Sequence, residues 1–149
     1  MTHGDRAVED GCNLRCAPDP SYNPSGLALA RSRRQAQYEG RAARGNTLLR
    51  EWLSPEQKTQ FDTFKSFGVV GCNTGKSYRI QYGVSANVVE LDDAGRPTIG
   101  WCFVPTGNLV PGDVMLAQKI ALETDVRRAL AVARQFLVPQ LPFRLSPVP

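Results

Sequence analysis

The sequence has a single histidine, His3, and no run of apolar residues long enough to cross a bilayer. One imidazole excludes a metal site built from two histidines, and a Ser-His or Cys-His pair would need the first residues to fold back onto the rest. Because a membrane-spanning helix requires about 20 apolar residues, we expect no membrane partner. The opening MTHGDRAVEDG also lacks the apolar core of a secretory signal. We therefore expect a cytoplasmic protein, or one within a particle assembled in the cytoplasm.

Cysteines are also few, namely Cys12, Cys16, Cys72 and Cys102. Without an export signal we expect reduced thiols and no disulfide framework. Structural zinc takes two tight pairs of ligands, and only Cys12 and Cys16 form one; the other two would have to meet on adjacent strands. We expect no metal and no cofactor, and a redox link between Cys12 and Cys16 stays open.

The carboxylates form no catalytic pattern. Asp92 and Asp93 fall in a Gly-containing turn, where solvated side chains are usual, and no cleft with an apposed acid and base can be identified. Lacking a nucleophile, a metal site and an acid-base pair, the chain is expected not to be an enzyme.

What is present is a globular composition with one basic segment. The 149 residues, 42% hydrophobic and 21% charged, fit one domain with appendages. The net charge is +4, yet residues 25–50 contain six arginines against Glu39 alone and so carry +5. This asymmetry indicates an anionic partner for the segment.

The sequence divides into three regions. Residues 1–45 form a basic arm, extended at first and helix-permissive from Ser25, which is a possible cap, with Gly40 and Gly45 weakening the helix. Residues 46–138 form an α+β domain, and residues 139–149 form an extended Pro-rich tail.

The domain opens with helical signals. The stretch NTLLREWL predicts a short helix, and a second helix follows at Ser54. Ser54 stands at the N-cap, Pro55 at the first helical position and Gln57 at the third, which is a capping box. This second helix should turn Phe61 and Phe64 inward.

Four extended runs follow, FGVVGC, KSYRIQY, ANVVEL and TIGWCFV. Tyr78, Ile80 and Tyr82 share one face of their run, as in an antiparallel sheet. Turn residues at 73–76 and 92–95 predict two hairpins. We expect a four-stranded antiparallel sheet packed against one preceding helix and a C-terminal helical segment, with extended arms at both ends.

The C-terminal segment reads as a helix capped by Asp113 and broken or renewed at Thr124–Asp125. In its first part Leu116 and Ile120 share a face. A buried stripe is predicted in its second part, at Val126, Ala129, Leu130, Ala133 and Leu137. Beyond Pro139, the residues Leu141, Phe143 and Leu145 suit contact with a surface.

One resemblance rests on the strings LSPEQ, TGKSYRI, CFVP and GDVMLAQKIALE. Together they resemble a domain of small bacterial and phage-borne proteins that has no assigned activity. The resemblance covers roughly residues 48–134 and implies the domain limits, while leaving the function and the N-terminal arm open.

The string from Gly71 to Ser77, GCNTGKS, is similar to a phosphate-binding P-loop. A P-loop has four residues between its glycines and opens a helix, whereas here three intervene and a strand follows. We therefore expect a hairpin turn with an exposed Lys76.

The best-founded signal is the set of arginines Arg31, Arg33, Arg34, Arg41 and Arg44. We expect a structural or interaction protein that docks into a larger assembly, such as a phage or phage-like particle, through its terminal arms and protein neighbours. The alternative is a small accessory protein that binds the nucleic-acid backbone without sequence preference through these arginines.

Overall fold

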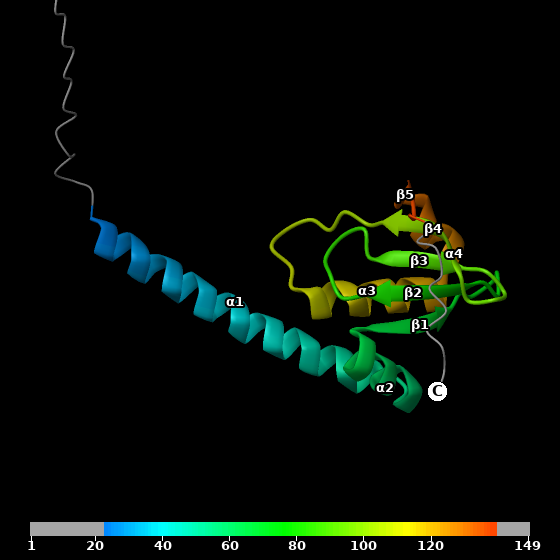
Figure 1. Ribbon diagram of the computed structural model, residues 1–149, viewed down its shortest axis with the longest axis horizontal. Coiled ribbons are helices and arrows are strands. Elements are labelled where there is room, and N and C mark those ends of the chain that lie inside the picture. Colours follow the sequence, from blue (N-terminus) through cyan, green and yellow to red (C-terminus); the bar gives the residue numbers. More distant parts are fainter. Residues whose placement is uncertain (1–22, 140–149) are drawn as a thin grey trace, which may run out of the picture. The chain divides into compact units, whose positions relative to one another are not determined.

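The computed structural model describes residues 23–139 and shows an α+β fold (Figure 1). Its elements, in chain order, are α1 (Pro24–Trp52), α2 (Pro55–Phe64), β1 (Ser66–Val70), β2 (Ser77–Gln81), β3 (Val88–Leu91), β4 (Pro97–Cys102), α3 (Pro111–Thr124), α4 (Val126–Ala131) and β5 (Arg134–Leu137). The predicted extended segments before residue 23 and after residue 139 lie outside the described residues. The chain divides into two units after Arg34, and the second unit contains the whole sheet.

The sheet is an antiparallel meander in the order β1-β2-β3-β4-β5. Both predicted hairpins are present: Val69 pairs with Tyr78 across the first, and Val89 with Gly100 across the second. The expected sheet had four strands, and the residues that the structure describes form a sheet of five.

The additional strand β5 corrects the prediction of a helix continuing to Leu137. The helical segment ends at Ala131, and the chain then pairs with β4. Gly100 explains the pairing, because a Cβ at this position would overlap the Phe136 ring, which occupies that space. Leu137 is 95% exposed, so it does not belong to the predicted buried stripe, whereas Val126 and Ala129 do.

Helix α2 is confirmed together with its capping box and the burial of Phe61, whereas the prediction that Phe64 turns inward is wrong, because Phe64 is 73% exposed. The Gln57 amide donates to the Ser54 hydroxyl, and the Ser54 amide donates to the Gln57 side chain. Two glutamines of α2 also engage Gly68 of β1: Gln57 donates to its carbonyl at 2.8 Å and Gln60 accepts from its amide at 2.8 Å. Since Gly68 is thereby satisfied, α2 protects the outer edge of β1 from pairing with another strand.

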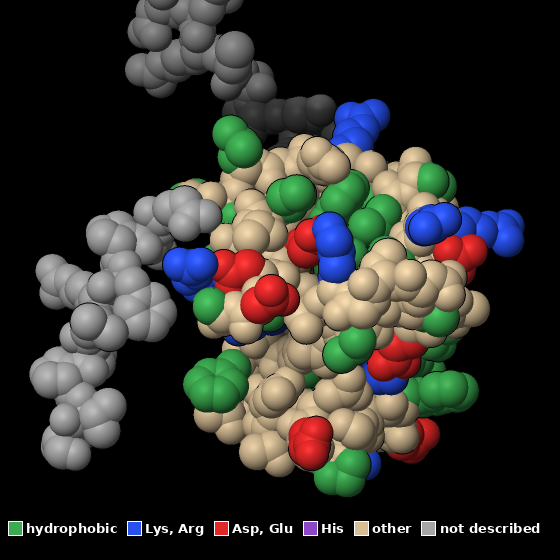
Figure 2. Space-filling view, turned by 90° about the vertical axis from the view of Figure 1, so that its right-hand side faces the viewer, with side chains coloured by type: hydrophobic (Ala, Val, Ile, Leu, Met, Phe, Trp, Pro, Cys, Tyr) green, Lys and Arg blue, Asp and Glu red, His purple; other side chains and the backbone are tan. Residues whose placement is uncertain are grey.

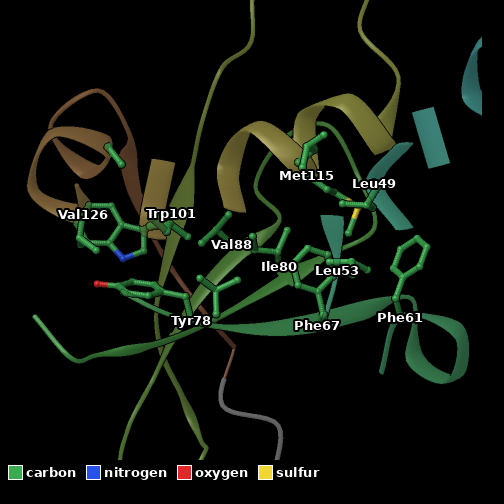
Figure 3. Packing of buried hydrophobic residues seen from close by; sticks show 14 residues of the cluster. Leu49, Leu53, Phe61, Phe67, Tyr78, Ile80, Val88, Trp101, Met115 and Val126 are labelled. Atoms are coloured by element: carbon green, nitrogen blue, oxygen red, sulfur yellow. The ribbon is translucent and has the colours of Figure 1, made fainter. Parts of the chain in front are cut away.

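The core lies between one face of the sheet and the helices (Figure 3). Figure 3 shows Phe67, Tyr78 and Ile80 on the sheet side, with Leu49 of α1 and Met115 of α3 opposite them. We call this the inner face of the sheet. Tyr82, which was expected to continue the row, lies beyond the end of β2 and is 45% exposed, with its ring beside that of Phe61.

The expected short helix NTLLREWL is the last part of α1, which runs on through Gly40 and Gly45. Gly45 lies where α1 packs against α3. A Cβ added at Gly112 of α3 would overlap the Gly45 carbonyl and lie 2.6 Å from the Asn46 amide nitrogen. The two glycines therefore allow α1 and α3 to cross in direct backbone contact.

The start of α3 also differs from the prediction. Its N-cap is Val110, and Asp113 lies within the first turn, where its charge favours the helix dipole. Ile120 is exposed, and Leu122 takes the buried position. Asp125 does cap the renewed helix, since its carboxylate accepts from the Arg128 amide at 3.1 Å.

Candidate functional site

All five predicted arginines lie on α1. Arg31, Arg33 and Arg34 are exposed and belong to the first unit. Within residues 23–139, none of the five arginines takes part in an ion pair. The charges of these five arginines are therefore not paired with a carboxylate in the described part of the chain.

Arg41 and Arg44 belong to the second unit, and the structure gives them different surroundings. The Arg41 guanidinium is half-buried and donates to the backbone carbonyl of Asn108 in the loop between β4 and α3. Arg44 is exposed and borders a hollow of about 320 Å³ together with Leu48 and Asp113. Arg41 thus holds a loop, which charge counting alone did not reveal.

The local sequence explains why α1 begins where it does. Asn23 caps the helix, because its side chain accepts from the Gly26 amide at 3.0 Å; the expected cap, Ser25, already lies inside the helix. Glu39, the single acidic residue of the basic segment, accepts from the Gln35 side chain at 2.8 Å. The segment is helical through local propensity and capping, with few large buried side chains.

The P-loop-like string forms the turn between β1 and β2. Asn73 and Gly75 have φ values of 70° and 69°, and the amides of Gly71 and Gly75 donate within the turn. A phosphate site needs such amides free and followed by a helix, whereas Ser77 begins β2. Lys76 is exposed, as predicted, and it also forms an ion pair with Glu90 at 2.6 Å.

The Lys76–Glu90 pair lies in a groove of about 740 Å³ between the two hairpin turns. Glu90 is 8% exposed, and its hydrogen bond and charge raise the pKa of Lys76 above the ordinary value. In the second turn, backbone and side-chain hydrogen bonds from Arg96 hold the pKa of Asp92 below its ordinary value. Figure 2 shows this end of the molecule, where acidic and basic side chains are interspersed.

Two ion pairs, Lys76–Glu90 and Arg96–Asp92, therefore neutralise most of the charge at this groove. In the part of the chain that the structure covers, no three His, Cys, Asp or Glu side chains are placed to hold a metal ion. The buried pairing of Glu90 was not predicted, although a single carboxylate within the apolar run ANVVEL was a usable signal for it.

The cysteines do not assemble into a site within the described residues. Cys72 lies in the β1–β2 turn and Cys102 at the far end of β4, so they are at opposite ends of the sheet on strands that are not neighbours. Both are half-buried free thiols. His3, Cys12 and Cys16 lie outside the described residues.

Comparisons of the chain with family models, curated proteins and solved structures found no match. Among the described helices, including the long α1, none is apolar enough over a sufficient length to cross a membrane.

Proposed function

We propose that the chain is a non-enzymatic interaction protein that docks into a larger assembly, such as a phage or phage-like particle, through its terminal arms. The supporting observation is the exposed surface of α1. Along residues 24–39 the helix is exposed at nearly every position, and it presents apolar side chains such as Leu29, which is 55% exposed. An isolated helix of this kind is only marginally stable in water, so a partner that covers it gains apolar contact area.

The domain supplies the fixed base for this arm. Arg50 at the end of α1 pairs with Asp62 of α2, and Leu49 is completely buried in the core. The last turns of α1 are thus anchored, while the preceding residues present their side chains to a partner.

Size-exclusion chromatography of an extract from the native source tests this proposal. The full chain should elute in a large complex, and a chain lacking residues 1–34 should elute as a small protein. A full chain that elutes as a free monomer, with its terminal residues open to protease, contradicts the proposal.

A second function is supported by the uncompensated arginines of α1. Such a helix suits contacts with the phosphate backbone of a nucleic acid, and four or five contacts would give a salt slope of about −3 to −5 for the binding constant. Binding to arbitrary duplex DNA at two salt concentrations measures this slope.

The chain offers a matched control for charge. Changing Arg33 and Arg34 to Gln removes two exposed positive charges from α1, and changing Arg127 and Arg128 to Gln removes two exposed positive charges from α4. Loss of DNA binding only in the first variant supports the nucleic-acid function. Equal loss in both, or salt-insensitive binding by the parent chain, contradicts it.

A further inference from the structure

The face of the sheet opposite the core, which we call the outer face, carries an open groove. The side chains of β1 and β2 alternate between the two faces, so those of Val70 and Arg79 point to the outer face. The groove has a volume of about 610 Å³ and extends over β1 and β2 to Phe64 of α2. Phe64 is 73% exposed and Val70 is 64% exposed. Two large apolar side chains therefore border a hollow that the described helices leave uncovered.

An occupant of this groove cannot simply extend the sheet. The outward amide and carbonyl of Gly68, in the middle of β1, already bind Gln60 and Gln57. Backbone pairing along β1 is therefore blocked, and a chain segment must lie across the strands and contact them through side chains. A segment rich in proline, which lacks backbone donors, suits this mode of contact.

The chain leaves β5 at the same end of the sheet at which β1 ends. The strand pairing places five residues in one row across the sheet, namely Leu137, Ile99, Glu90, Tyr78 and Val69. The last residue of β5 therefore lies at the same end of the sheet as the last residues of β1. Four strand spacings of about 4.8 Å separate β5 from β1, a total of about 19 Å. An extended chain covers this distance in about six residues. Counting from Val138, the groove is within reach from Phe143 onward.

The residues that follow have the required chemistry. The sequence from Gln140 is QLPFRLSPVP, in which apolar side chains alternate with proline and polar residues. The prolines disfavour a helix and remove backbone donors. Because this segment is covalently attached close to the groove, its effective concentration there is in the millimolar range, and weak side-chain contacts are sufficient for occupancy.

We propose that residues 141–149 lie extended across the outer face of their own chain, with Phe143 and Leu145 in the groove beside Phe64 and Val70. This goes beyond the proposed function and does not depend on it. It narrows the proposed docking from both terminal arms to one, because the C-terminal arm takes a site on its own sheet and the N-terminal arm with α1 is left for an external partner.

Disulfide trapping tests the placement. In a chain whose four native cysteines are replaced by serine, Leu145→Cys is combined either with Val70→Cys or, as the control, with Val132→Cys. Val132 is at least as accessible as Val70 but lies just before β5, at the opposite end of the sheet. The 70–145 pair should form a disulfide within one chain at least about tenfold faster than the 132–145 pair. Equal rates overturn the proposal, and so do disulfide-linked dimers, which would show that the groove receives the segment of a second copy.

A second measurement keeps the native cysteines. Ending the chain after Pro139 should expose the groove and increase the fluorescence of a dye that binds apolar surfaces several-fold, without a change in the far-ultraviolet circular dichroism of the domain. Adding the peptide QLPFRLSPVP at millimolar concentration should reverse the increase. Unchanged dye fluorescence after truncation overturns the proposal.

Discussion

The crossing of α1 and α3 gives the sharpest test of how the arm is anchored. A Cβ added at Gly112 would lie 2.6 Å from the Asn46 amide nitrogen and would overlap the backbone of Gly45. Since non-bonded heavy atoms approach to about 3.5 Å, the helices would have to separate by about 1 Å. The atoms in the way are backbone atoms, which cannot rotate aside as a side chain does. We therefore expect Gly112→Ala to destabilise the fold by about 1–3 kcal/mol, the range for overpacked cores.

The helix propensity of alanine works against this loss and must be measured separately. Gly40 lies within α1, and a Cβ added there would meet no atom of a neighbouring element within 4 Å. Gly40→Ala should therefore stabilise the protein by about 0.5–1 kcal/mol through propensity alone. The two variants make the same chemical change and should shift stability in opposite directions.

Urea denaturation followed by circular dichroism measures both variants. With the slope usual for a small domain, Gly112→Ala should lower the urea midpoint by about 1 M, while Gly40→Ala raises it. The separated helices should also speed the cleavage by trypsin after Arg41, which is half-buried in the parent chain, in the Gly112→Ala variant. If Gly112→Ala is as stable as the parent chain, α1 does not cross α3 in backbone contact and the reasoning fails.

Three further substitutions test other parts of the fold. Ser54→Ala removes the capping box of α2 and should cost about 1 kcal/mol in urea denaturation, and an unchanged midpoint would mean that the cap contributes nothing. Asn87→Ala leaves the buried Gln118 amide without its two hydrogen bonds, of 2.8 and 2.9 Å, and should cost about 1–3 kcal/mol of stability. Adding Gln118→Leu should recover part of this loss. If the stability changes of the two substitutions simply add in the double variant, the pairing is contradicted. Burial raises the pKa of Tyr78, so the contribution of the neutral phenol to stability is complete below about pH 10 and is lost as the pH rises further. The stability of Tyr78→Phe should therefore fall less steeply above pH 10 than that of the parent chain. Parallel plots of stability against pH for the two chains would refute the shift.

The surroundings of the Tyr78 hydroxyl also predict the stability of Tyr78→Phe at neutral pH. It is buried without a hydrogen bond of normal geometry, although the nearby Thr74 hydroxyl weakly opposes the rise of its pKa. Figure 3 shows the Tyr78 ring beside Trp101, whose indole nitrogen is likewise buried without a partner among the described residues. Because no bond is lost, Tyr78→Phe should leave the stability at pH 7 unchanged or slightly increased.

Local signals account for the parts of the fold that could be predicted. Ser54 and Gln57 stand three positions apart, and the cap they form involves no distant residue. The turn residues at 73–76 and 92–95 similarly fix two hairpins whose strands are close in sequence. Each of these predictions depends on contacts between residues that lie near one another along the chain.

Strand β5 could not be found in this way, because its assignment depends on β4. Val126, Ala129 and Leu130 have helical spacing, and Leu137 extends that spacing by coincidence. The strand forms where Phe136 can pack over Gly100, thirty-six positions earlier in the chain. The same limit applies to Gly45, which weakens a helix locally and is required only by its crossing with Gly112.

In the candidate site, too, the features set by local sequence could be predicted and those set by distant residues could not. The arginines of α1 were found from charge alone, because an excess of one sign is a property of the segment itself. The bond from Arg41 to the Asn108 carbonyl was not, since the two residues are sixty-seven positions apart. Among the five arginines, Arg41 is therefore the one whose substitution should also affect the stability of the domain.

The distribution of satisfied polar groups allows an experiment to separate residues that bind a partner from residues that stabilise the domain. In the domain, Lys76 pairs with Glu90, and Asn87 exchanges hydrogen bonds with Gln118. These groups have partners and support the fold, whereas Arg33 and Arg34 have no ion-pair partner within residues 23–139. Substitutions at Arg33 and Arg34 should therefore abolish binding to an external partner while the urea midpoint stays unchanged, because no contact that supports the domain is lost. Substitution of Lys76 should change the stability without affecting that binding, and the opposite pattern would place the interaction on the sheet.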